Sequence, residues 1–125
     1  MALYIKHGIN CTVRDDLGAY SRIDFDCVYI ELPVIHQRKN IVGCIYRAPG
    51  LDLRLFKNEF EQLICKITSE NADLFQVGDY NINLHFYEYK EDTADFVNHL
   101  CSHLSLALIN RPTWFTENTS TINIQ

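Results

Sequence analysis

The sequence lacks an apolar run of the roughly 18 residues that a membrane span needs, and its first residues lack the apolar region of a signal peptide. Five cysteines stand far apart and form no Cys-x-x-Cys pair: Cys11, Cys27, Cys44, Cys65 and Cys101. Such a scattered, odd set indicates reduced, mostly buried thiols and argues against a zinc site. We therefore expect an intracellular protein, nuclear or cytoplasmic, with no membrane partner.

The sequence also has no excess of basic residues. Lysine and arginine number 11 against 16 aspartates and glutamates, which gives a net charge of −5. No global positive field therefore points to nucleic acid. A nuclease is not excluded, because a metal-dependent active site is itself acidic. With 125 residues, 47% of them apolar, the chain predicts one globular domain.

The most informative stretch runs from Leu74 to Asn83. Its apolar first half ends at Gly78, and Asp79, Asn81 and Asn83 follow within five residues. This pattern predicts a buried strand that ends at a polar cluster. Open α/β sheets usually bind ligands at the carboxyl ends of their strands. The plainer alternative is a strand that leaves the core through a turn stabilised by Asp and Asn side chains.

The rest of the chain alternates between strand and helix patterns, which predicts a mixed α/β fold. Two helices are expected from apolar residues at three- and four-residue steps and from capping residues. The expected strands are 2–7, 11–14, 25–32, 41–47, 72–77 and 105–109, and the expected helices are 53–69, capped by Asp52, and about 93–103, capped by Asp92 or Thr93. We expect loops at 15–21 and 110–118 and an extended end at 119–125.

Three segments resemble one protein family, in the same order along the chain. Gly78-Asp79-Tyr80-Asn81 is similar to the Gly-Asp-Phe-Asn signature of the endonuclease/exonuclease/phosphatase superfamily, which has the DNase I-like fold. Residues 41–49 resemble the "IYRPP" segment, and residues 108–113 the "I-N-x-P-T-R" segment, of endonuclease domains in LINE-like (non-LTR) retrotransposons. The resemblance covers nearly the whole chain. It implies that residues 1–125 form a partial domain of this superfamily, an incomplete DNase I-like α/β sandwich with mixed β-sheets flanked by helices.

The resemblance assigns roles in phosphodiester hydrolysis to five residues. Asp79 would orient and activate the attacking water, Asn81 would donate to a phosphate oxygen, and Tyr46 would place its hydroxyl near the scissile phosphate. Arg47 would contact a phosphate and Asn83 would shape the loop as a substrate-binding residue. Without the resemblance, an ordinary strand tyrosine is the favoured interpretation of Tyr46, and Arg47 is equally a solvated strand end.

Other family positions have no counterpart here. The metal-binding Asn and Glu of the family precede the strand that residues 1–5 resemble, and no Ser-Asp-His sequence is present. Trp114 also stands where the family has an arginine. Groups of one catalytic constellation act as a unit. We therefore expect a fragment truncated at both ends that, without the Mg²⁺ ligands of the complete domain, is inactive or weakly active alone.

Two classes of function follow. The first is a Mg²⁺-dependent DNA endonuclease domain that accompanies a reverse transcriptase domain in a full-length element. The second is a non-catalytic interaction remnant that self-associates through exposed sheet edges. A phosphoinositide phosphatase or sphingomyelinase of the same fold is disfavoured, because the segments at 41–49 and 108–113 resemble the retrotransposon branch.

Overall fold

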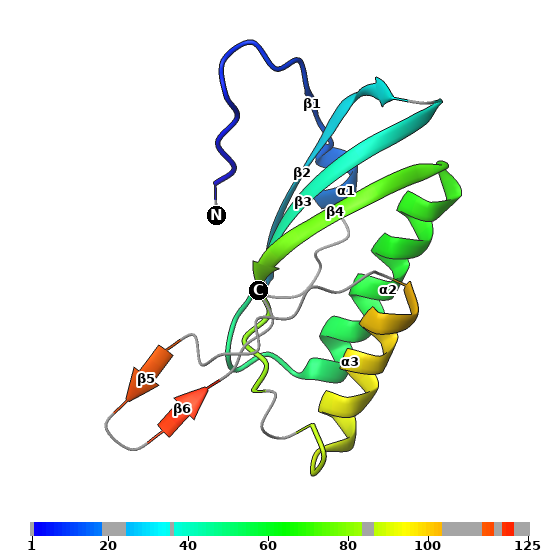
Figure 1. Ribbon diagram of the computed structural model, residues 1–125. Helices are drawn as coiled ribbons and strands as arrows, with labels where there is room; N and C mark the ends of the chain where they lie inside the picture. Colours follow the sequence, from blue (N-terminus) through cyan, green and yellow to red (C-terminus); the bar gives the residue numbers. More distant parts are fainter. Residues whose placement is uncertain are drawn as a thin grey trace.

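The computed structural model of the chain describes residues 2–18, 25–35, 37–83, 87–103, 114–116 and 119–121. Its elements are β1 (Thr12–Val13), α1 (Asp15–Gly18), β2 (Phe25–Ile35), β3 (Arg38–Arg47), α2 (Leu53–Ser69), β4 (Ala72–Asp79), α3 (Glu91–His103), β5 (Trp114–Thr116) and β6 (Thr119–Thr121). Strands β1 to β4 form one sheet, and β5 pairs with β6. Helices α2 and α3 cover the same face of the four-stranded sheet (Figure 1). Within the described ranges, no helix is long and apolar enough to cross a membrane.

The sheet follows the chain order β1-β2-β3-β4. Strands β2 and β3 are antiparallel neighbours, whereas β3 and β4 are parallel. A parallel pair needs a crossover connection, and α2 supplies it. The parallel pairing brings the carboxyl ends of β3 and β4 to the same edge of the sheet, so that Tyr46 lies beside Asp79.

Helix α2 has the predicted bounds and the predicted cap. The Asp52 carboxylate accepts hydrogen bonds from the backbone N–H groups of Arg54, at 2.8 Å, and Leu55, at 3.4 Å. These bonds satisfy donors that have no partner within a helix, and they lower the pKa of Asp52. The apolar stripe of α2 is buried, as its spacing predicts, and consists of Phe56, Phe60, Leu63, Ile64 and Ile67.

The core lies between this helical layer and the sheet. Phe56 is at its centre, with ring centroids 5.1 Å from Phe25 of β2 and 5.5 Å from Phe96 of α3. Edge-to-face and tilted aromatic pairs of this kind stabilise a core beyond the area they bury. The remaining core residues are Leu17, Tyr29, Ile41, Ile45, Phe60, Leu63, Ile64, Ile67, Ala72, Tyr80, Ile82, Val97 and Leu100.

Several expected elements differ in the structure. Residues 2–7, expected as a strand, are not in a strand and are mostly exposed, so no neighbour satisfies the pairing that a strand requires. Asp15–Gly18 is a short helix where a loop was expected, because buried Leu17 anchors it to the core. Trp114–Thr116 is a strand within the expected loop 110–118, since it pairs with β6. The expected strand 105–109 lies outside the described residues.

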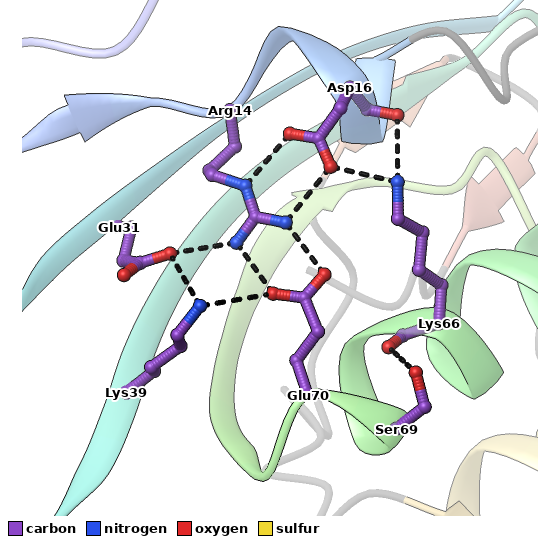
Figure 2. Close-up of polar contacts among 7 residues, drawn as sticks. All are labelled: Arg14, Asp16, Glu31, Lys39, Lys66, Ser69 and Glu70. Atoms are coloured by element: carbon purple, nitrogen blue, oxygen red, sulfur yellow. Dashed lines mark hydrogen bonds and ion pairs between the residues drawn. The ribbon is translucent and has the colours of Figure 1, made fainter.

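A network of charged side chains ties the amino-terminal elements to the sheet and to the end of α2 (Figure 2). Arg14 donates to the carboxylates of Asp16 at 2.8 Å, Glu31 at 2.7 Å and Glu70 at 2.7 Å. Lys39 lies 3.4 Å from Glu70. The hydrogen bond from Arg14 lowers the pKa of the Glu70 carboxyl. This network lies at the start of β4, at the opposite end from Asp79, which indicates a structural role.

All five cysteines carry free thiols, as expected. The expectation that they are mostly buried is wrong, because Cys11, Cys27 and Cys44 are only partly buried and Cys65 and Cys101 are exposed on helices α2 and α3. Both side chains lie outside the apolar stripes that face the core.

Candidate active site at the carboxyl ends of two parallel strands

The turn that ends β4 requires glycine at position 78. Gly78 has a φ angle of +157°, which L side chains rarely adopt. A Cβ atom there would also overlap the backbone carbonyl oxygen of Ile45, its neighbour on β3. The glycine therefore lets the end of β4 stay close to β3, and the next residue, Asp79, begins the polar cluster predicted from the sequence.

Tyr46 and Asp79 lie side by side on the outer face of the sheet. They are register partners on the parallel strands β3 and β4. The side chain of Tyr46 is 39% exposed and Asp79 is half-buried. Since Ile45 on the next position is fully buried toward the helices, strand alternation places Tyr46 on the opposite face. The structure thus brings together a phenol and a carboxylate that are 33 positions apart.

Asn81 joins the end of β4 to the end of β3. Its backbone N–H donates to the Asp79 carboxylate at 2.9 Å, and its side-chain Nδ2 donates to the carbonyl oxygen of Arg47 at 2.7 Å. Its φ angle of +50° is left-handed, which asparagine tolerates better than most residues. The first contact is the Asp/Asn turn that the plainer alternative predicted. The turn and the candidate site therefore share the same residues, and the turn fixes the carboxylate of Asp79.

Arg47 lies on the other side of the sheet from Tyr46 and Asp79. Its side chain is 5% exposed, and its guanidinium carbon is 5.9 Å from the ring centroid of Phe56. Burial lowers its pKa, which the nearby charges of Asp52 and Asp79 partly oppose. Nη1 donates to the carbonyl oxygen of Ala48 at 3.1 Å, whereas the buried Nε has no hydrogen-bond partner. A solvated strand end, the alternative for Arg47, is wrong.

One aromatic residue that the sequence analysis did not assign to the site, Tyr80, packs between the site and the core. The ring of Tyr80 is buried and lies 6.1 Å from the rings of both Phe56 and Phe60. Burial raises the pKa of its phenol. Tyr80 therefore anchors the loop between Asp79 and Asn81 to α2. Its burial could have been predicted from the sequence, because Tyr80 is the apolar residue within Gly-Asp-Tyr-Asn.

The remaining predicted residue, Asn83, is half-buried on the segment that follows buried Ile82. The segment beyond residues 84–86, which lie outside the described part, begins with Tyr87, whose hydroxyl donates to Asn98 of α3 at 3.0 Å. This contact places Tyr87 against a helix.

The described residues do not by themselves fit a Mg²⁺ site. Mg²⁺ prefers several oxygen ligands in near-octahedral geometry. In the described part of the chain, no group of three or more His, Cys, Asp or Glu side chains is arranged to hold a metal ion. One oxygen of Asp79 also accepts the N–H of Asn81. What the arrangement offers is a fixed carboxylate beside an exposed phenol, which suits orientation of a small polar molecule such as water.

Comparisons with known proteins find a likeness among solved structures. No protein-family model matches the chain, and no curated protein matches it. Among solved structures, it is similar to the endonuclease domain of TRAS1, a telomere-specific non-LTR retrotransposon, with a TM-score of 0.64 and 14% sequence identity. The match covers 94% of this chain and 55% of that one. The chain thus has an incomplete DNase I-like α/β fold similar to that of a retrotransposon endonuclease domain, as the three motifs predicted, and it spans about half of that chain's length.

Proposed function

We propose that the chain is part of a metal-dependent phosphodiesterase domain of retrotransposon type that cleaves DNA, and that these 125 residues alone cleave little or none. The observation that supports it best is the pairing of Tyr46 with Asp79 at the carboxyl ends of β3 and β4. In a fold shared with a retrotransposon endonuclease domain, the signature Gly-Asp-Tyr-Asn thereby occupies the expected place for a site.

The proposed roles are those that the family resemblance implies, and the arrangement of the side chains is compatible with them. Asp79 accepts a hydrogen bond from the attacking water and orients it, because one of its oxygens is already fixed by Asn81. Tyr46 donates its hydroxyl hydrogen to an oxygen of the scissile phosphate, from a position beside Asp79. The side-chain amide of Asn81 carries two hydrogens and donates one of them to the carbonyl oxygen of Arg47. The second hydrogen can be donated to a phosphate oxygen.

Arg47 and Asn83 are the proposed substrate contacts. For Arg47 this contact requires the guanidinium to leave the Phe56 ring, since it lies on the helical side of the sheet. A buried cation whose Nε has no partner is costly, so a phosphate is a suitable counter-charge. We include Mg²⁺ dependence in the proposal because the motifs resemble those of a Mg²⁺-dependent family. The residue roles given above do not depend on where the ion binds.

Nicking of supercoiled plasmid tests the proposal. The purified chain is assayed with Mg²⁺, with a chelator, and as Asp79→Ala. Asp73→Ala is the matched control, because Asp73 lies at the other end of the same strand and face. We expect no cleavage, or weak cleavage that both the chelator and Asp79→Ala abolish and Asp73→Ala preserves. Strong cleavage by the chain alone contradicts the proposed inactivity, and cleavage that persists in Asp79→Ala contradicts the site.

A DNA-binding measurement distinguishes a chain whose site binds DNA without cleaving it from a chain that has no such site. In an NMR titration with a short DNA oligonucleotide, amide shifts are expected around Tyr46, Asp79 and Asn81. Asp79→Asn is expected to tighten binding several-fold, because it removes a negative charge that faces the phosphate. Shifts confined to other surfaces exclude a phosphodiester site at this position.

A non-catalytic interaction role is the second proposal, and a specific observation favours it. Phe75 and Val77 of β4 are 59% and 54% exposed on the outer face of the sheet. Exposed apolar patches on a sheet often mark contact surfaces. The partners in this case are a second copy of the chain, or the reverse transcriptase domain of a longer element.

A further inference from the structure

The outer face of the sheet is apolar across all four strands. The register aligns Val13, Ile30, Val42 and Phe75 in one row, and Val28, Cys44 and Val77 in the next. Acidic residues follow on β4 at both ends of these rows, Asp73 on one side and Asp79 on the other. Helices α2 and α3 cover only the opposite face (Figure 1).

Strand β4 also has an edge that none of the described strands covers. It is the last strand of the sheet order, and no strand in the described part of the chain pairs with its outer side. Natural edge strands usually avoid pairing through lysine, proline, bulges or shortness. The eight residues of β4 contain neither lysine nor proline, and positions 74–78 carry no charge. This edge is therefore suited to accept another strand.

The sequence of β4 is complementary to itself in an antiparallel pairing. With Gln76 opposite the partner's Gln76, Phe75 lies opposite the partner's Val77, and by symmetry Val77 lies opposite the partner's Phe75. Two aromatic–β-branched cross-strand pairs result, a stabilising combination. The small Gly78 lies opposite the partner's Leu74 on the inner face.

In the same register, acidic residues meet at both ends of the paired strands. Asp73 then lies opposite the partner's Asp79, which alone would be repulsive. However, Arg38 is bound to Asp73 at 2.8 Å and is about half exposed. Its guanidinium is therefore available to its own Asp73 and to the partner's Asp79. By symmetry, the same arrangement occurs at the other end of the paired strands.

We infer that β4 is a self-association edge, and that its occupant is β4 of a second copy in an antiparallel, two-fold pairing centred on Gln76. The dimer is isologous, so it closes and does not extend into a filament. The two sheets become one continuous sheet with all helices on one side, and the apolar rows of the two copies join at Phe75 and Val77.

Sedimentation velocity over a wide range of protein concentration tests this pairing. The wild-type chain is expected to form a reversible dimer. Val77→Lys is expected to weaken dimerisation by at least about tenfold, because it alters both cross-strand pairs and places a lysine on the edge. The matched control is Val13→Lys, which changes the same residue type on the same face, 57% exposed, at the other edge of the sheet.

Equal weakening by both variants would mean that a partner covers the face and does not pair with β4, and a monomeric wild type would overturn the inference outright. Hydrogen exchange on the wild-type chain gives a test that needs no variant. Amides at positions 74–78 are expected to gain protection as concentration rises. Protection that is already complete at the lowest concentration would mean that the edge is filled within one chain, which also overturns the inference.

Discussion

Asn81 makes two separate contributions that substitutions can measure independently. Its side chain donates to the Arg47 carbonyl at 2.7 Å, and its backbone is left-handed at φ +50°. A lost hydrogen bond of this kind costs about 1 kcal/mol, and a left-handed backbone costs an alanine about 1–2 kcal/mol. Asn81→Ala is therefore expected to lower the free energy of unfolding by about 2–3 kcal/mol. Asn81→Gly keeps the backbone conformation and is expected to cost about 1–2 kcal/mol, from the lost bond and the glycine's added entropy.

Asn71 provides the matched control. It follows α2 with a similar left-handed φ of +55°, and its side chain is exposed. Asn71→Ala is expected to cost only about 1 kcal/mol, and Asn71→Gly is expected to be close to neutral because glycine is favoured after a helix.

Urea unfolding followed by circular dichroism measures all four variants. A change of 2–3 kcal/mol shifts the midpoint by roughly 1–2 M for a domain of this size. The reasoning is refuted if Asn81→Ala costs no more than Asn71→Ala, since the bond to Arg47 would then add nothing. It is also refuted if Asn81→Gly and Asn81→Ala are equally destabilised, because the left-handed backbone would then carry no penalty.

Two further predictions concern stability. Phe56→Ala should lower the free energy of unfolding by about 3–5 kcal/mol, because its fully buried ring contacts four other aromatic rings. The control Phe75→Ala, at a 59% exposed site, should change it by no more than about 0.5 kcal/mol. Similar losses for the two variants in urea unfolding would contradict the assigned core. The hydrogen bond from Arg14 lowers the pKa of Glu70, so its contribution is present above the unfolded pKa of about 4.3 and is lost as the pH falls. Glu70→Gln should therefore reduce the loss of stability between about pH 7 and about pH 3, and an unchanged pH dependence would exclude this linkage.

The predictable parts of the fold were those set by local sequence. Helix α2 begins and ends where the apolar spacing and Asp52 predicted, because a cap and a helical stripe act within a few residues of each other. Strands β2, β3 and β4 were found at their predicted positions, each longer at one end. The expected strand at 2–7 failed because a strand exists only when a partner pairs with it.

Within the site, the sequence by itself determined which chemical groups are present. The glycine before Asp79, the carboxylate, the two asparagines and Tyr46 could be named from motifs alone. Only the tertiary structure decided that Tyr46 lies beside Asp79 and that Arg47 points to the helices. Strand register is a long-range property, and a shift of one residue would exchange the two faces of β3. The buried Ile41 and Ile45 fix that register through the core, and they thereby turn Tyr46 toward the site and Arg47 away from it.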